Sequence, residues 1–497
     1  MPDNSPLRYD CTFDPAKGGT EYHVGPGQRY TRLADVPFEH LGPGDMVRVE
    51  YLSTPYYEKV LLSTRGTASS PIVLCGILGP NGERPILDAH NAISRLGAPY
   101  GAYHPMQEEA VVLAYNTDRW TTPKPGNLVI ANFEIRGARD NVGFTDNAGA
   151  TSAFSIDSSS VYLFGAENVV IQNTDLHDSG DGLFVNSKDD ASDVSLSRNI
   201  VVRGNLIHDN GDPRSYLVHN IYTEASGIVF EFNYLGQCVA GASGNVLKDR
   251  SAGTVIRYNW IEAGGHLLDL VDPQESRAVM QNEPDMHETF VYGNVLHDTG
   301  PNWAGYLVHY GGDSGGDNAT GYVYRQGTLH FFDNTVLIQL DASDAWQVAL
   351  FHLSTNGETV NLTNNIFAVY PRTSGSAPEL DLRGTNQGAT ANGNLVIGKN
   401  WITTGYVATG NGAITGASNL IAGTDPGFIN VSRLDLHLAP GSPARAAAMA
   451  QDATVTSRRI GIAFEYVSPL PVPTYAETTV QYQSRADSSH LNLGALH

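Results

Sequence analysis

The sequence predicts an all-β fold, a single-stranded parallel β-helix, from three observations. An Asn recurs between two short apolar segments, the residue three positions before each Asn is apolar, and successive copies are 41, 32, 28, 26, 35, 40, 31 and 29 residues apart. Such self-similarity is typical of a solenoid, whose coils bury their apolar faces only by stacking on one another. The recurring residues are Asn132, Asn173, Asn205, Asn233, Asn259, Asn294, Asn334, Asn365 and Asn394.

Each recurring Asn is expected at a tight corner between two strands. Asn tolerates left-handed backbone geometry and can bond to neighbouring backbone, so stacked copies would form a ladder. A β-propeller is the rival fold, but its blades need four strands and a more even period of about 40 residues. The Asn corner resembles that of the pectate-lyase-like superfamily of right-handed parallel β-helices, over about residues 125–400. This resemblance implies a right-handed helix.

Three regions are expected along the chain: 1–120 as the N-terminal cap and first coils, 121–425 as the β-helix core, and 426–497 as the closing segment. The stretch EYHVGPGQRYTRLADVPFEHLGPGDMVRVE is similar to the opening of such proteins, with a strand and then a short amphipathic helix at roughly 31–41. This helix would cap the first coil, whose edge would otherwise be unpaired. GFINVSRLDLHLAPGSPA resembles the closing segment of many bacterial β-helix proteins, and 466–497 should pack along the outside or extend as a tail.

A further strand is expected about a dozen residues before each corner. Because strand side chains alternate, one aligned position should face the core and the next should face outward. The inward candidates, all apolar, are Ile156, Val185, Ile221, Leu247, Leu268, Val308 and Phe351. The outward residues that follow them, all polar or titratable, are Asp157, Asn186, Tyr222, Lys248, Asp269, His309 and His352. We interpret this outward row as a functional strip.

A second outward row lies two residues further on. Its members are Ser159, Lys188, Glu224, Arg250, Val271, Gly311 and Ser354. Lys248 and Arg250 therefore share one strand and one face. Insertions at 206–218, 271–290 and 311–327 are expected to gather on one side of the solenoid and to shape a groove. A long groove with titratable residues at its middle suits a polysaccharide substrate.

The stretch NVLKDRSAGTVIRYNWI resembles the lysine-bearing strand of the chondroitinase B and alginate lyase group of polysaccharide lyases. That resemblance implies β-elimination on a uronic-acid-containing polysaccharide, with Lys248 as the base. The arginine that this group carries one coil later is absent, because HLLDLVD stands there. Arg250, on the lysine strand itself, is the expected substitute.

Elimination needs a base for the proton next to a carboxylate and a cation that neutralises the carboxylate. Lys248 fits the role of the base, and Arg250 fits that of the cation that neutralises the carboxylate. Asp269 lies one coil away from Lys248. Tyr222, or a histidine such as His219, is the expected acid that protonates the leaving oxygen. The residues expected to bind substrate are His309, His352, Asn186, Glu224 and His266. The one cofactor that the sequence suggests is Ca²⁺, with Asp157, Asn186 and Glu224 as oxygen ligands. The sequence has no contiguous calcium-binding loop.

Two other functions stay open at this point. A glycoside hydrolase would need paired carboxylates, and Glu224 and Asp269, two rungs apart, come nearest to the separation found in inverting enzymes. A non-catalytic carbohydrate-binding or adhesive solenoid would show a flatter and more repetitive face. The lysine at the centre of the strip favours the lyase.

The composition argues against two kinds of binding partner, nucleic acids and membranes. The net charge is −22, with 30 Lys and Arg against 52 Asp and Glu and no basic cluster, which argues against nucleic-acid binding. No stretch reaches the roughly 18 apolar residues of a membrane span.

The three cysteines, Cys11, Cys75 and Cys238, are an odd number and are widely spaced, so we expect buried thiols rather than a disulfide framework. The first ten residues lack the features of a signal peptide, and we expect either a cytosolic protein or an exported one, secreted or periplasmic. The oligomeric state is open.

Overall fold

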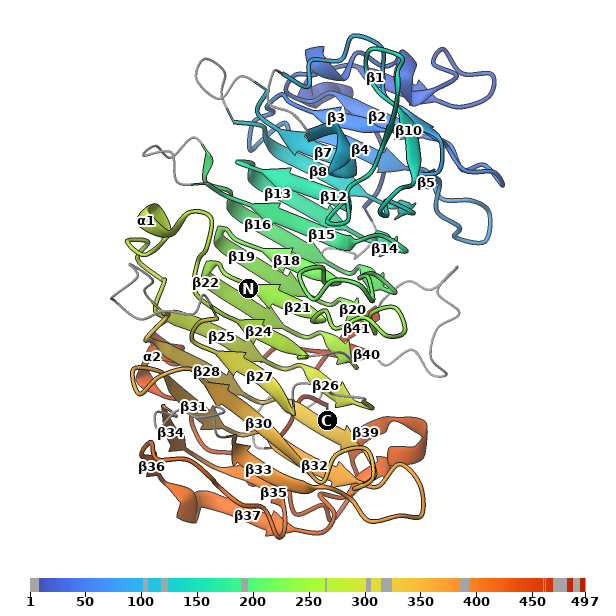
Figure 1. Ribbon diagram of the computed structural model, residues 1–497. Helices are drawn as coiled ribbons and strands as arrows, with labels where there is room; N and C mark the ends of the chain where they lie inside the picture. The colour runs from blue at the N-terminus through green and yellow to red at the C-terminus, as the bar shows by residue number, and fades with distance from the viewer. Residues whose placement is uncertain are drawn as a thin grey trace.

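The computed structural model shows a solenoid of stacked coils (Figure 1). It describes residues 9–101, 106–117, 124–188, 195–263, 266–300, 305–313, 324–384, 393–458, 460, 462–467, 481–485 and 492–496. Within these ranges, three long parallel sheets of thirteen, ten and eleven strands run along the molecule. The predicted fold class, a parallel β-helix, is confirmed.

Each coil contributes one short strand to each sheet. In one central coil these are β18 (Ile221–Thr223), β19 (Ser226–Glu231) and β20 (Tyr234–Leu235). The next coil supplies β21 (Leu247–Asp249), β22 (Ala252–Arg257) and β23 (Trp260–Glu262), which pair in parallel with β18, β19 and β20. The thirteen-stranded sheet runs from β1 (Glu21–Val24) to β36 (Ile414–Thr415), and the eleven-stranded sheet from β5 (Ile86–Asp88) to β37 (Leu420–Gly423).

The ten-stranded sheet carries the predicted functional strip. Its strands, in spatial order, are β3 (Val60–Leu62), β7 (Ala110–Tyr115), β12 (Ser159–Phe164), β15 (Asp181–Asn186), β18, β21, β24 (Leu268–Leu270), β27 (Tyr306–Tyr310), β30 (Gln347–Leu353) and β33 (Glu379–Arg383). All are parallel to their neighbours, so the side chains of successive coils stand in straight rows across the sheet.

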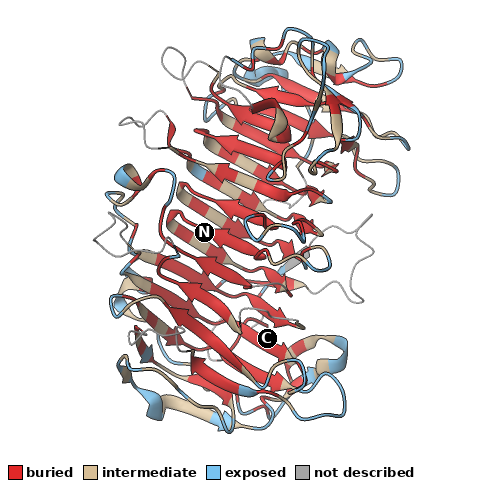
Figure 2. Ribbon diagram, viewed as in Figure 1, coloured by how far each residue is buried: buried red, intermediate tan, exposed pale blue. Residues whose placement is uncertain are grey.

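The core is the apolar interior of the coils, which is continuous along the molecule (Figure 2). Six of the seven predicted inward residues belong to it and are almost wholly inaccessible: Val185, Ile221, Leu247, Leu268, Val308 and Phe351. Ile156 does not, because the strand of its coil begins later, at Ser159, and points Val161 and Leu163 inward. The β-branched and aromatic segment that follows Ser159 forms the strand.

The corner ladder exists and is built from stacked side-chain amides. Each Nδ2 donates to the Oδ1 of the next coil's Asn at 2.8–3.1 Å, through Asn205, Asn233, Asn259, Asn294, Asn334, Asn365 and Asn400. Asn400 closes this row, so the prediction of Asn394 was wrong; Asn394 begins β34 (Asn394–Ile397). Left-handed geometry belongs to the residue before each ladder Asn from Asn205 to Asn365, such as Phe232 (φ 57°) and Tyr258 (φ 56°). Asn132 and Asn173 occupy this preceding position, with φ of 64° and 50°.

The N-terminal cap differs from the predicted helix at roughly 31–41. Two 3-10 turns stand there, η2 (Leu33–Asp35) and η3 (Phe38–His40). Pro37 separates them, because it lacks an amide hydrogen and restricts the residue before it. Leu33, Val36 and Phe38 nevertheless bury their side chains against the core. The apolar face was predicted correctly, and the α-helical geometry was not.

The closing segment packs back along the outside of the coils. The antiparallel strands β40 (Phe464–Val467) and β41 (Gln481–Ser484) are preceded by α2 (Ala453–Ser457). The ring of Phe464 lies 6.0 Å from that of Phe232 and 6.1 Å from that of Tyr258, centroid to centroid. This confirms, for its described residues, the packing along the outside. Among described helices, none has the length and apolar character needed to cross a bilayer.

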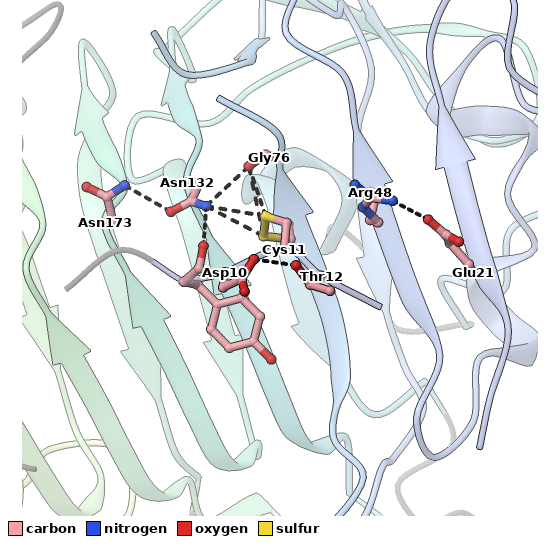
Figure 3. The surroundings of a disulfide bond; sticks show 10 residues. Asp10, Cys11, Thr12, Glu21, Arg48, Gly76, Asn132 and Asn173 are labelled. Atoms are coloured by element: carbon pink, nitrogen blue, oxygen red, sulfur yellow. Dashed lines mark hydrogen bonds and ion pairs between the residues drawn. A yellow bond between two sulfur atoms is a disulfide. The ribbon is translucent and has the colours of Figure 1, made fainter. Parts of the chain in front are cut away.

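Cys11 and Cys75 form a disulfide (Figure 3). The expectation of unpaired thiols was therefore wrong for these two, while Cys238 is a buried free thiol. The bond ties the N-terminal segment to β4 (Ile72–Gly76). Next to it, Asn132 Nδ2 donates to the carbonyl oxygens of Tyr9 (3.0 Å) and Gly76 (3.2 Å). The N-terminal segment lies outside the repeat, so the repeat pattern could not bring the two cysteines together.

Candidate active site

One outward row crosses the ten-stranded sheet in register. Its members are Tyr162, Phe184, Tyr222, Lys248, Asp269, His309 and His352. Neighbouring members are one strand apart, about 4.8 Å. The predicted strip thus exists from Tyr222 to His352. Towards the N-terminal end, Phe184 and Tyr162 stand where Asn186 and Asp157 were predicted.

At Asp157 the error is five residues, because β12 begins only at Ser159, and at Asn186 it is a register shift of two residues. Leu183, not Val185, pairs with Ile221, so Asn186 belongs to the second row together with Glu224 and Arg250. A shift of two keeps inward residues inward, and alternation alone therefore cannot detect it.

Lys248 and Arg250 share a carboxylate that the sequence did not single out. Lys248 Nζ lies 2.7 Å from Asp269 Oδ2 and also contacts Asp313. Arg250 Nη2 lies 2.8 Å from Asp313 Oδ1. The Asp313 amide donates to Asp272 Oδ1 at 3.0 Å, which fixes the start of the insertion after β27. No local motif marks Asp313, because the insertion breaks the repeat.

Both carboxylates of this cluster are ionised at neutral pH. Burial alone would raise the pKa of Asp269, but Lys248 and the hydrogen bond from His309 outweigh it and hold the pKa well below its usual value. Burial is likewise outweighed at Asp313 by Lys248 and Arg250, which lower its pKa. Asn245 Nδ2 adds a hydrogen bond of 2.7 Å to Asp269 Oδ2.

The row continues into a cluster of histidines. His309 Nδ1 donates to Asp269 Oδ1 at 2.8 Å, and its Nε2 lies 2.9 Å from Ser354 Oγ. The His352 ring stacks on His309 with centroids 4.7 Å apart. Burial lowers the pKa of His352 to about 3 and that of His266 to about 4, so both are neutral hydrogen-bonding groups at neutral pH.

His219 and Tyr222 flank the lysine on the other side. His219 Nδ1 accepts a hydrogen bond from the Asn245 amide at 2.9 Å, which places the ring proton on Nε2. Burial, reinforced by Lys248, lowers the pKa of His219 to about 3. Burial raises the pKa of Tyr222 above its usual value, so the phenol keeps its proton. The Arg250 guanidinium carbon lies 5.6 Å from the centre of the Tyr222 ring.

Glu224 does not face the groove. It is wholly buried, and its carboxylate accepts hydrogen bonds from the amides of Gln274 (3.0 Å), Glu275 (3.0 Å) and Ser276 (2.6 Å). It therefore anchors the insertion at 271–290, which contains α1 (Arg277–Met280). The predicted substrate contact of Glu224 and its predicted pairing with Asp269 as a hydrolase pair do not fit this environment.

The three suggested calcium ligands do not assemble into an ion site. Glu224 is occupied as described, and Asn186 Nδ2 donates to the Tyr162 hydroxyl at 2.9 Å. Within the described ranges, no group of three or more His, Cys, Asp or Glu side chains has the geometry to hold a metal ion. Of the predicted groove walls, the insertion at 311–327 is described only at its two ends, since 314–323 lie outside the described residues.

No family model and no curated protein match this chain. Among solved structures, it is similar to an alginate lyase from Paenibacillus sp. str. FPU-7 at 12% identity and a TM-score of 0.43, over 73% of this chain and 97% of that one. It is also similar to the pectate lyase Pel9A at 11% identity and a TM-score of 0.41, over 90% of this chain and 96% of that one. A third similar structure is the GH136 lacto-N-biosidase from Eubacterium ramulus, at 12% identity and a TM-score of 0.41, over 82% of this chain and 68% of that one.

Proposed function

We propose that this protein is a polysaccharide lyase that cleaves a uronic-acid-containing polymer by β-elimination. The supporting observation is the carboxylate of Asp313, which contacts both Lys248 and Arg250. A uronate presents the same chemical group. Two adjacent cations that already hold one carboxylate form a binding site for another, and guanidinium groups suit carboxylates in particular.

The groups around this site can supply each step of the elimination. The substrate carboxylate displaces Asp313, and Arg250 neutralises the charge that develops on it as the neighbouring C–H bond breaks. Lys248, oriented by Asp269, first gives one of its protons to water and then takes that proton from the substrate. The electron pair forms the new C=C bond and expels the glycosidic oxygen, which takes a proton from Tyr222. A proton from water then restores Tyr222.

The hydrolase alternative loses the acidic pair predicted for it. Glu224 is fully used by backbone amides, and Asp269 is committed to Lys248 and His309. Glycoside hydrolysis needs one protonated and one ionised carboxyl group, whereas Lys248 holds the pKa values of both Asp269 and Asp313 below their usual value, so both are ionised.

The proposal is tested with a panel of uronate polymers, among them polygalacturonate, alginate and chondroitin sulfate, by the ultraviolet absorbance of the unsaturated product. Lys248→Ala should abolish that absorbance, and Lys17→Ala, at an exposed site, should leave it unchanged. A Lys248→Ala variant with full turnover would remove the lysine from the mechanism. Reducing ends without absorbance would indicate hydrolysis, and no cleavage of any polymer would favour a binding protein.

We also propose that the protein works outside the cytosol, in a secreted or periplasmic location. The Cys11–Cys75 disulfide supports this, because structural disulfides persist mainly in oxidising compartments. Alkylation of protein isolated under denaturing, non-reducing conditions should modify only Cys238. Modification of all three cysteines would contradict an oxidising location.

A further inference from the structure

A cavity of about 340 Å³ lies on the ten-stranded sheet, on the N-terminal side of Tyr222. Its volume lies within the range of small-molecule sites in proteins. Tyr162, Phe164 and Phe184 line it, and Phe184 is the residue of the main row two strands before Lys248, about 10 Å away. A ligand here could therefore belong to the same sugar chain that reaches Lys248.

Aromatic rings form a continuous surface in this cavity. The Phe184 ring stacks on Tyr222 with centroids 4.7 Å apart and meets Tyr162 edge-on at 4.9 Å. Tyr222 covers one face of the Phe184 ring, and another part of the Phe184 surface stays exposed at the cavity. The face of an aromatic ring is electronegative and attracts the weakly positive C–H groups of a flat partner. The C–H face of a pyranose ring is such a partner.

The titratable groups at the polar side of the cavity are mostly acidic. Glu109, Asp157 and Glu275 line it against a single cation, Lys188. Ionised carboxylates only accept hydrogen bonds, so they suit a ligand rich in hydroxyl donors. Burial, with Asp157 close by, raises the pKa of Glu109 to about 8, so this carboxyl group can also donate at neutral pH.

Tyr162 adds a fixed donor. Its hydroxyl accepts a hydrogen bond of 2.9 Å from Asn186 Nδ2, and the Oδ1 of the same amide accepts from the Ser187 amide at 2.8 Å. Asn186 is thus held in one orientation. The proton of the Tyr162 hydroxyl remains available to a ligand hydroxyl.

We propose that this cavity is a subsite for a neutral pyranose, a sugar unit without carboxylate or sulfate. A uronate placed here would bring its charge against the carboxylates of Asp157 and Glu275, and like charges in a partly buried site repel strongly. If the proposed lyase function holds, on which this second step rests, the substrate is a heteropolymer with a neutral sugar near the uronate that Lys248 attacks.

Binding is measured apart from cleavage, by saturation-transfer NMR and calorimetry on the Lys248→Ala protein. The probes are cellotetraose, mannotetraose and β-1,4-galactotetraose, with tetragalacturonate as the charged counterpart. At least one neutral tetrasaccharide should bind, and Phe184→Ala should weaken it tenfold or more. Tyr57→Ala, which removes a half-exposed aromatic ring outside the cavity, should leave it unchanged.

A second variant tests the charge argument without touching the core. Glu275 is exposed, and Glu275→Lys should raise the affinity for tetragalacturonate at least fivefold while leaving the neutral ligand within twofold. The subsite is refuted if no neutral tetrasaccharide shows Phe184-dependent binding, or if tetragalacturonate competes equally well in the unmodified cavity. It is also refuted if Glu109→Gln abolishes cleavage with unchanged binding, because Glu109 would then be catalytic. Neutral-sugar binding without cleavage of any uronate polymer would refute the lyase alone.

Discussion

At the scale of single residues, Asp313 has two opposing effects. Its charge compensates two nearly buried cations, and without it Lys248 and Arg250 would share only Asp269 and Asp272. An uncompensated buried charge lowers the stability of the folded state, so Asp313 stabilises the protein when no substrate is bound. In the proposed mechanism, the same contacts must break before a uronate can bind. Under that proposal, Asp313 holds the two cations in place and lowers the affinity for substrate.

Replacing Asp313 should separate these effects. We expect Asp313→Ala to lower KM for a cleaved uronate polymer by about tenfold, which corresponds to about 1.4 kcal/mol. The same change should lower the melting temperature, since the cation pair loses its partner. Steady-state kinetics and thermal unfolding measure the two quantities, with Asp285→Ala, at a surface ion pair, as the control. A raised KM would show that Asp313 assists binding rather than competes with it.

The residues that the sequence located correctly are those fixed by the repeat. Lys248, Asp269, His309 and His352 fall in one row, because parallel pairing carries the register from coil to coil. Phe184 was missed through a two-residue shift that alternation cannot reveal. Asp313 and Glu109 were missed for another reason: an insertion and an N-terminal coil position their side chains, and neither belongs to the aligned strands.

At the scale of structural elements, the corners make the coils cooperative. Asn259 Oδ1 accepts from both Asn233 N and Asn233 Nδ2 at 2.9 Å, and its Nδ2 donates to Asn294 Oδ1 at 2.9 Å. The Asn259 side chain thus forms hydrogen bonds with the coil before it and with the coil after it. The sequence predicted this ladder, but the left-handed position before it appears only in the backbone. Phe232 and Tyr258 adopt that conformation despite their bulk.

Removing one amide from the ladder interior should be costly. Asn259→Ala leaves the Asn233 backbone amide without its acceptor and removes one hydrogen bond each from Asn233 Nδ2, Asn294 Oδ1 and Phe230 O. Each buried group left unsatisfied costs about 1–3 kcal/mol. We expect a loss of about 3–5 kcal/mol in the free energy of unfolding, measured by denaturant titration. Asn199→Gly, which removes an exposed amide and keeps the left-handed geometry, should cost less than about 1 kcal/mol. Equal losses at both positions would contradict a stabilising ladder.

The corner at Asp333 makes stability depend on pH. Burial raises the pKa of Asp333 to about 7, from an ordinary value of 3.8. Between these values the folded state binds more protons than the unfolded state, so this group contributes stability below pH 4 that is lost as pH rises through 7. Asp333→Asn removes the titration, and Asn suits the left-handed conformation found there (φ 52°).

We therefore expect the advantage of Asp333→Asn over the unmodified protein to grow by about 3 kcal/mol between pH 5 and pH 8. Denaturant unfolding at the two pH values measures it. Asp425→Asn, in an exposed loop, should show no such growth. A constant difference between the two pH values would mean that Asp333 ionises alike in the folded and unfolded states.

At the scale of the whole molecule, a solenoid is held together by contacts between neighbouring coils, and its ends are its weakest points. The closing segment lies along the side of the coils: the ring of Tyr466 is 6.1 Å from that of Trp260, and Ala495 N donates to Thr335 Oγ1 at 3.0 Å. At the first coils, η2 and η3 cover the open end, and the Cys11–Cys75 disulfide fastens the N-terminal segment across β4.

The disulfide should therefore protect the first coils selectively. It closes a loop with a sequence separation of 64 residues, for which chain entropy predicts a stabilisation of about 4 kcal/mol. Reduction, or Cys11→Ala, should accelerate hydrogen exchange in β1, β2 (Met46–Val49) and β4, while β18, β21 and β24 keep their protection. Cys238→Ala, which removes the free thiol, should leave exchange in β4 unchanged. Unaltered exchange in β4 after reduction would mean that stacking on β8 (Gly126–Ala131) alone holds the first coils. Uniform acceleration in every coil would mean that the solenoid unfolds as one cooperative unit rather than from its end.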